Sequence, residues 1–206
     1  MYDYENDLLK NGSTFICGCD EAGRGPLAGP VVASAVILNP KDIIEGLNDS
    51  KQLSEKTRED LYIKIKEHAF AYGISIISPE EIDEINIYQA SKLAMLQAIK
   101  ALNLKPDFIL SDAMPLHEAN IPFLAIVKGD TLSASIAAAS ILAKVTRDRL
   151  MVEYSKQYPN YGFEKHKGYP TKAHIEALNR YGITPIHRLT YEPVKSLIKK
   201  QISFDL

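Results

Sequence analysis

Two adjacent carboxylates, Asp20 and Glu21, follow a short apolar run and precede a glycine-flanked arginine in the order Gly23-Arg24-Gly25. Carboxylate oxygens are the ligands that Mg²⁺ and Mn²⁺ prefer in proteins. Glycine lets a backbone loop approach a phosphate or a sugar closely. The run therefore indicates a metal-dependent site that acts on a nucleic-acid backbone.

Two further acids, Asp112 and Asp130, come at or just after the ends of apolar runs that are typical of buried strands. In open α/β sheets, ligands bind beyond the carboxyl ends of the strands, so Asp20, Asp112 and Asp130 could converge there. Each aspartate alone is more typical of a turn or a helix N-cap. Together with Glu21, the set indicates a two-metal centre, which hydrolyses phosphodiesters by activating water and stabilising the leaving oxygen.

The elements that must position these acids are strands and helices of ordinary length. Strands are predicted over residues 15–19, 30–38, 71–78, 107–111 and 121–127. Helices are predicted over residues 54–69, 86–102, 132–158, 171–180 and 192–200, with N-caps at Ser54, Asn86 and Thr171. Asn86 and Gln89 form the pattern of a capping box. The first two strands are joined by a Gly/Pro-rich loop and are expected to be antiparallel neighbours.

This order of elements predicts the α/β class, a mixed sheet flanked by helices with a C-terminal helical extension. We expect a single domain over residues 1–206, with a core of about residues 14–158 and an extension of about residues 159–206. The formal net charge of −2 conceals a segregated distribution, because residues 141–200 contain 12 Lys or Arg and only 5 Asp or Glu. Such a basic region suits phosphate binding, although solvated helix faces would give the same pattern.

No run approaches the roughly 20 apolar residues that span a bilayer, and the first residues lack the basic and apolar segments of a secretion signal. We therefore expect a cytoplasmic protein without a membrane partner. Cys17 and Cys19 would point to the same face of one strand, where burial is expected rather than a disulfide or a metal site.

Five longer motifs extend this pattern. They are DEAGRGPLAGP at residues 20–30, DSKQL at 49–53, KGD at 128–130, AAASILAKVTRD at 137–148 and HKGY at 166–169. In this order they resemble the type 2 ribonucleases H, and bacterial ribonuclease HII in particular. The resemblance implies a ribonuclease H-like fold and an endonuclease that cuts the RNA strand of RNA–DNA hybrids. It also implies cleavage 5′ of a single ribonucleotide in duplex DNA, as in ribonucleotide excision repair, leaving 3′-hydroxyl and 5′-phosphate ends.

The resemblance assigns roles to individual residues. The catalytic metal ligands would be four acids that hold two Mg²⁺ or Mn²⁺ ions, with the first acid shared between the ions: Asp20, Glu21, Asp112 and Asp130. The loop that reads the ribose 2′-hydroxyl would consist of Gly23, Arg24 and Gly25, with Tyr169 as its partner. The 2′-hydroxyl is the group that distinguishes RNA from DNA. Without the motif, Tyr169 would be more typical of a half-buried core residue.

Basic side chains in the motifs are predicted phosphate contacts, because backbone contacts fix the register of a protein on a duplex. These residues are Lys51, Lys144, Arg147, His166 and Lys167. Lys144 and Asp148 are four residues apart, so a surface ion pair on a helix is the alternative. The pair His187-Arg188 also matches the family, but its residues alone indicate no role.

Three alternatives remain at this point. A nucleotide-phosphate cradle is disfavoured, because Ala28 interrupts the G-x-G-x-x-G pattern. A ribonuclease HIII-like nuclease would carry an additional N-terminal domain, whereas about 14 residues precede the first strand here. A non-catalytic hybrid-binding protein would have little reason to keep four crowded carboxylates. Finally, the segment 201–206, QISFDL, resembles the peptides that dock on bacterial sliding clamps, which makes the clamp a candidate partner.

Overall fold

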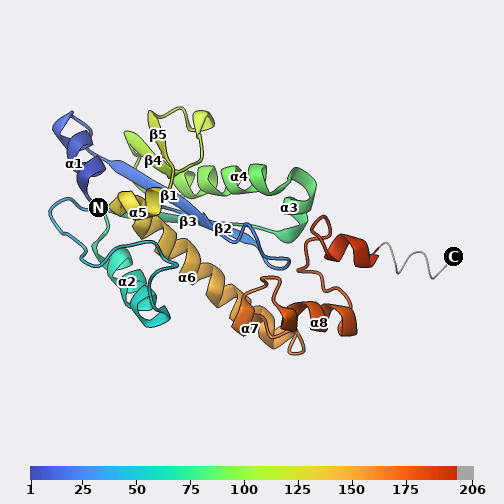
Figure 1. The fold of residues 1–206 in the computed structure, drawn as a ribbon. Helices are drawn as coiled ribbons and strands as arrows, with labels where there is room; N and C mark the ends of the chain where they lie inside the picture. The colour runs from blue at the N-terminus through green and yellow to red at the C-terminus, as the bar shows by residue number, and fades with distance from the viewer. Residues whose placement is uncertain (199–206) are drawn as a thin grey trace.

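The computed structural model describes residues 1–198 and centres on a five-stranded mixed sheet of order β3-β2-β1-β4-β5 (Figure 1). The strands are β1 (Ile16–Ala22), β2 (Val31–Ile37), β3 (Ala71–Ile77), β4 (Phe108–Asp112) and β5 (Phe123–Ile126). β1 pairs antiparallel with β2, and β2 with β3, whereas the β1–β4 and β4–β5 pairs are parallel. The predicted α/β class and the antiparallel first pair are confirmed.

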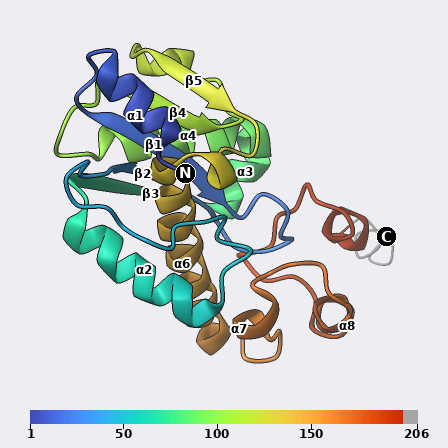
Figure 2. The same ribbon diagram turned by 60° about the vertical axis from the view of Figure 1, so that its left-hand side comes forward.

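Helices cover both faces of this sheet. They are α1 (Asp3–Lys10), α2 (Glu55–His68), α3 (Pro79–Ile85), α4 (Ile87–Lys100), α5 (Gly129–Leu132), α6 (Ala134–Gln157), α7 (Phe163–His166) and α8 (Lys172–Tyr181), with a 3₁₀ turn η1 (His117–Ala119). The helix α4 packs on one face, against β1, β2 and β3, while α6 packs on the other with α2 beside it (Figures 1 and 2).

The long helix α6 approaches the sheet unusually closely, because both surfaces are built from small residues. A Cβ added to Gly18 on β1 would lie 2.1 Å from the backbone carbon of Ser135 on α6. On β2, the Ser34 hydroxyl donates to the Ala139 carbonyl of α6 at 2.7 Å. The alanines at residues 137–139 are buried, and the close approach of the helix to the sheet fixes α6 beside β1.

Several local predictions are confirmed by the N-caps. Ser54 accepts from the Thr57 amide, and Asn86 accepts from the amides of residues 88 and 89. The capping box, however, lies one helix earlier, between Ser78 and Glu81 at the start of α3. Cys17 and Cys19 are buried and unbridged, as expected.

The segment after α6 turns back along the molecule to the Gly/Pro-rich loop between β1 and β2. The Leu27 amide donates to the Gly168 carbonyl, and the Arg188 amide donates to the Leu27 carbonyl, each at 2.8 Å. In Figures 1 and 2, α7, α8 and the final helical turns lie together at the end of α6 remote from α1. Residues 194–198 are helical, and the rest of the predicted last helix lies outside the described residues. Within residues 1–198, no helix is both long and apolar enough to cross a membrane.

Candidate active site

Three of the predicted metal ligands meet at the carboxyl ends of the parallel strands. One carboxylate oxygen from each of Asp20, Asp112 and Asp130 lies within 4.8 Å of the others. The β1–β4 register explains the first pair, because Cys19 stands opposite Ser111 and the next residues along the two strands are Asp20 and Asp112. Residues in register on parallel strands project from the same face, here the face covered by α6.

The third acid is positioned by a tight connection after β5. Lys128 takes a left-handed conformation at φ 58°, and the chain then enters the single turn α5, which contains Asp130. The Gly129 amide donates to Asp112 Oδ1 at 2.8 Å. A Cβ on Gly129 would lie 2.6 Å from Ile136 Cδ1, so a larger residue would require this side chain to shift. The KGD motif therefore links the second and third acids through one hydrogen bond.

Glu21 lies beside this group but does not belong to it. Its Oε1 contacts Arg24 Nη1 at 3.4 Å, and its Oε2 is buried without a hydrogen-bond partner among the described residues. A buried carboxylate oxygen without a donor is costly, unless a ligand supplies the missing interaction. A bound cation would therefore satisfy this oxygen. The neighbouring carboxylates cannot do so, because they are anionic.

The raised pKa values of three acids indicate that the cluster favours bound positive charge. Burial, followed by the charges of Glu21 and Asp112, raises the pKa of Asp20 well above its ordinary value. Burial and the charges of Asp49 and Asp112 raise the pKa of Asp130. Burial raises the pKa of Glu21 as well, against the opposing effect of Arg24. Crowded carboxylates that resist ionisation in the absence of a partner are stabilised when cations bind between them.

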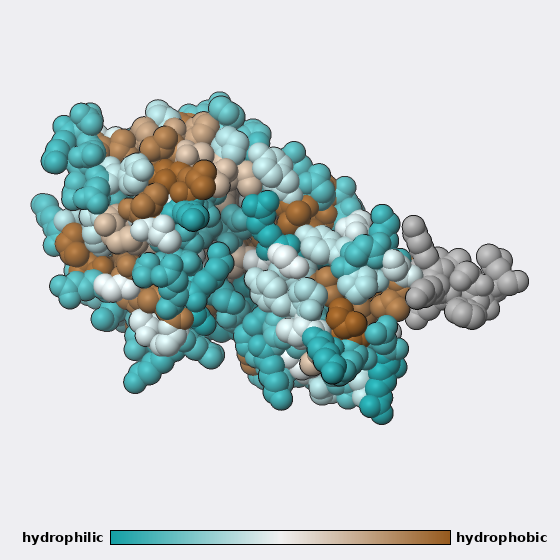
Figure 3. Space-filling view, viewed as in Figure 1, coloured by the Kyte–Doolittle hydropathy of each residue, from teal (hydrophilic) through white to brown (hydrophobic). Residues whose placement is uncertain are grey.

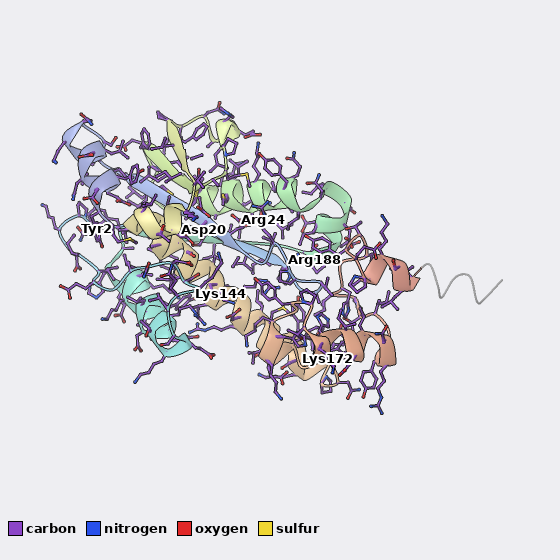
Figure 4. The ribbon with its side chains drawn as sticks, viewed as in Figure 1. Tyr2, Asp20, Arg24, Lys144, Lys172 and Arg188 are labelled. Carbon is purple, nitrogen blue, oxygen red and sulfur yellow. The ribbon has the colours of Figure 1, made fainter. Side chains whose placement is uncertain are left out.

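A cavity of about 200 Å³ opens beside the acids. Figure 3 shows mainly hydrophilic residues across the middle of this face, over the region where Figure 4 labels Asp20, Arg24 and Lys144. Most of the predicted site residues line the cavity, namely Asp20, Glu21, Gly23, Arg24, Gly25, Lys51, Asp112, Lys144, Arg147 and Tyr169. The cavity thus combines the acids with the glycine loop and the tyrosine.

The predicted phosphate contacts differ in their surroundings. Lys51 is exposed; partial burial lowers its pKa, but Asp49, Asp20 and other acids outweigh this effect and raise it. Lys144 Nζ forms a 2.8 Å ion pair with Asp148, which is the alternative expected from their spacing. Both lysines line the cavity.

Arg147 differs from the two lysines in its surroundings. It is buried, and its guanidinium donates to the carbonyls of Pro30, Lys167 and Ala28 at 2.9, 3.0 and 3.1 Å. All three guanidinium nitrogens are thereby engaged within the protein. The phosphate contact of Arg147 stays a prediction, whereas the contacts that the structure shows for its side chain hold backbone together.

His166 and Lys167 also lie away from the cavity wall as the structure describes it. His166 Nε2 donates to the Tyr161 carbonyl at 2.7 Å, while its Nδ1 accepts from the Gly168 amide at 3.2 Å. The Lys167 ammonium donates to the Glu164 carbonyl. The imidazole of His166 has no nitrogen left for a phosphate, so its placement differs from the prediction.

The turn that carries Tyr169 is held by a chain of histidines. His187 Nδ1 accepts from the Thr184 amide at 2.9 Å, so its proton is on Nε2 and points to His174 Nε2 at 3.1 Å. His174 must then carry its own proton on Nδ1, which donates to the Tyr169 carbonyl at 3.0 Å. Burial, then the neighbouring histidine, lowers the pKa of His187 to about 4; burial is also the main cause for His174, whose pKa falls to about 4.

Two groups beside the acids were missed from sequence. Asp49 lies close enough to Asp130 to raise its pKa, and Ser140 donates to Asp20 and thereby lowers the pKa of that acid. Ser140 also shares a 2.9 Å hydrogen bond with Ser50. Asp49 and Ser50 belong to the DSKQL motif and Ser140 to the alanine-rich motif, so the motifs themselves were the available signal.

Known structures share this arrangement of sheet and helices. The ribonuclease H2 of Pyrococcus horikoshii OT3 gives a TM-score of 0.78 with 29% sequence identity, covering 91% of this chain and 98% of that one. The ribonuclease HII of Archaeoglobus fulgidus, solved in a complex with PCNA, gives 0.76 with 28% identity, covering 87% and 96%. The fold is therefore that of the ribonucleases H.

Sequence comparison narrows this class. The profile of the family Ribonuclease HII matches residues 17–194. The Ribonuclease HII of Bacillus cytotoxicus is 56% identical over 202 residues, which are 98% of this chain and 78% of that relative. The chain belongs to the ribonuclease HII family, as its motifs predicted, and is an endoribonuclease that acts on RNA–DNA hybrids. Neither a ribonuclease HIII-like nuclease nor a non-catalytic binding protein is favoured.

Proposed function

We propose that this enzyme also cuts 5′ of a single ribonucleotide in duplex DNA, by two-metal catalysis that leaves 3′-hydroxyl and 5′-phosphate ends. The observation that carries the proposal is the convergence of Asp20, Asp112 and Asp130 within 4.8 Å of one another, where Asp20 and Asp112 line a cavity that is also lined by the glycine loop. Such a site can act on a phosphodiester beside a group that the loop recognises.

The proposed metal ligands are Asp20, Glu21, Asp112 and Asp130. The donor set consists of carboxylates alone, which suits Mg²⁺ or Mn²⁺ better than Zn²⁺. The orphaned Oε2 of Glu21 supports a cation on its side of the cluster. When bound, the two ions would activate water and stabilise the leaving oxygen. The protein would fix their positions through the strand register and the Gly129–Asp112 hydrogen bond.

Recognition of the 2′-hydroxyl is proposed for Gly23, Arg24, Gly25 and Tyr169. A Cβ on Gly25 would lie only 3.7 Å from the ring of Tyr169, so the loop and the ring face each other. Tyr169 is 41% exposed, which leaves its ring and hydroxyl free for a sugar, whereas a core tyrosine would be covered. Lys51 and Lys144 are proposed phosphate contacts on the same cavity, since both line it.

The assignment of the acids is tested by Asp130→Asn. We expect Mg²⁺-dependent cleavage of a hybrid to fall by at least about a thousandfold, because one cation would lose its anionic ligand. Binding of the hybrid, measured by fluorescence anisotropy, should change less than threefold, because the lysines that contact phosphate are intact. Asp60→Asn, on the exposed face of α2, is the matched control. Turnover of Asp130→Asn near that of the wild type would remove Asp130 from the catalytic set.

A sliding clamp is proposed as a partner. The segment 201–206 has the pattern of a clamp-docking peptide, and the Archaeoglobus fulgidus ribonuclease HII forms a complex with PCNA. The segment lies outside the described residues. Deletion of residues 201–206 should weaken clamp binding in surface plasmon resonance and leave hydrolysis intact. Unchanged affinity for the clamp would rule out this docking segment.

A further inference from the structure

Arg188 contacts the backbone of the proposed ribose-reading loop and is not part of the cavity wall as the structure describes it. The side chain is completely buried in the segment that follows α8, and Figure 4 labels it between the β1–β2 hairpin and the C-terminal helices. Among residues 1–198, all hydrogen-bond acceptors of its guanidinium are uncharged. A buried cation without an ion pair is expensive, so this position requires a specific reason.

The guanidinium is used entirely to hold the loop. Its Nη1 donates to the Arg24 carbonyl at 2.8 Å, and its Nη2 donates to the Gly23 carbonyl. Its Nε and Nη2 both donate to the Gly29 carbonyl, at 3.1 and 2.9 Å. Three carbonyls from both ends of the loop thus share one planar group, whose fixed fork sets their mutual geometry.

Tyr191 reinforces the same contact. Its hydroxyl donates to the Arg24 carbonyl at 2.9 Å and accepts from Arg188 Nη1 at 3.2 Å. The guanidinium also lies over the Tyr191 ring, with 5.0 Å between the guanidinium carbon and the ring centroid. The Arg24 carbonyl therefore receives two donors and cannot rotate freely.

Orientation of these peptides matters because the proposed recognition uses backbone groups. Each carbonyl that Arg188 holds belongs to a peptide whose amide is carried by the next residue, so fixing the Gly23 and Arg24 carbonyls fixes the amides of Arg24 and Gly25. Gly23 has φ 103°, a conformation that favours glycine, and glycine has no side chain that could anchor the loop. The loop consequently relies on contacts from other segments.

We infer that Arg188 is a positioning residue for ribose discrimination, which orients the Arg24 and Gly25 amides toward the 2′-hydroxyl without touching the substrate itself. The inference rests on the proposed reading of the 2′-hydroxyl by this loop. Arg188 and Tyr191 act together on the Arg24 carbonyl of the loop.

The test compares affinities of cleavage-deficient protein for two duplexes. Asp130→Asn protein is titrated in Mg²⁺ with a duplex that contains one ribonucleotide and with the same duplex made only of DNA. The double variant Asp130→Asn/Arg188→Lys keeps the positive charge but loses the fork. We expect the ratio of the two Kd values to fall about tenfold in the double variant, through weaker binding of the ribonucleotide duplex. Affinity for the all-DNA duplex should change less than twofold.

Controls separate positioning from folding. Asp130→Asn/Arg180→Lys changes an exposed arginine of α8 and should leave the ratio unchanged. If Arg188→Lys does not fold, Tyr191→Phe removes only the supporting hydroxyl and should lower the ratio about threefold.

Two results would overturn the inference. The first is an unchanged ratio of the two Kd values in the Arg188→Lys variant, or in Tyr191→Phe if Arg188→Lys does not fold. The second is an equal loss of affinity for both duplexes, because that would show a purely structural role. A ratio of one in the parent Asp130→Asn protein would instead refute ribose reading by the loop, and the positioning role with it.

Discussion

Asp112→Asn should stabilise the metal-free protein while destroying its activity. The substitution is nearly isosteric, and the side-chain oxygen of asparagine can still accept from the Gly129 amide. It removes one negative charge from a group in which three carboxylate oxygens lie within 4.8 Å of one another. The metal-free protein therefore contains electrostatic repulsion between carboxylates, which replacing one of them by an amide should reduce.

The size of the effect follows from Coulomb's law. At 4.8 Å and an effective dielectric constant of about 20, two ionised carboxylates repel each other by about 3 kcal/mol. Because burial and its neighbours raise the pKa of Asp20, the metal-free cluster takes up protons and part of this repulsion is already relieved. We expect Asp112→Asn to increase the free energy of unfolding by about 1–3 kcal/mol in EDTA.

Urea unfolding with and without Mg²⁺ measures this effect. A cation that binds only the folded state adds about 2.7 kcal/mol at a concentration of 100 times its Kd. The wild type should gain such stability from Mg²⁺ and Asp112→Asn much less, so their order reverses. Asp60→Asn should match the wild type in both conditions. Lower stability of Asp112→Asn in EDTA, or equal stabilisation of both proteins by Mg²⁺, would refute the account of the cluster.

Three further predictions concern the surroundings of the site. Because the pKa values of His174 and His187 are lowered to about 4, both imidazoles are neutral above about pH 6.5 and do not reduce the free energy of unfolding there. As the pH drops from about 6.5 toward 4, the free energy of unfolding should fall by up to about 3 kcal/mol for each histidine. Nitrogen-15 NMR should show midpoints near 4 and a neutral Nδ1–H form for His174, whereas midpoints near 6.5 would contradict the buried chain. Gly18→Ala should lower the free energy of unfolding by about 3 kcal/mol in urea, because its Cβ would overlap the backbone of α6; a loss below about 0.5 kcal/mol would show that α6 moves freely. Tyr169→Ala should leave the melting temperature within about 3 °C and remove most discrimination for the ribonucleotide; a large loss of stability with discrimination intact would make Tyr169 a core residue.

Much of the scaffold was predictable because its signals are local. Ser54 stands at the head of α2 as a cap, and the apolar runs that became β1 and β2 have the composition of strands. The helix α3 carried an equally local signal, since Ser78 is followed by proline and by Glu81, and it was missed only because the helix is short. Asp20, Glu21 and Asp130 were identified because they lie in motifs that match the family, and Asp112 because it ends a short apolar run typical of a buried strand.

The remaining features depend on contacts that a sequence does not reveal. Arg147 was predicted to contact phosphate and Arg188 had no predicted role, yet each binds backbone carbonyls contributed by segments more than 100 residues away. Asp49 lies in an aperiodic stretch, so its approach to Asp130 follows only from the folded chain. The histidine chain behind Tyr169 depends in the same way on how the final loops pack.

We propose that this enzyme recognises a ribonucleotide and cuts beside it with metals held by the acidic cluster. The most direct measurement maps the cleavage of duplex DNA that contains one ribonucleotide, in Mg²⁺, in Mn²⁺ and in EDTA. We expect a single cut 5′ of the ribonucleotide in either metal, with 3′-hydroxyl and 5′-phosphate ends, and none in EDTA. An intact duplex in both metals, alongside normal cleavage of a long hybrid, would contradict it.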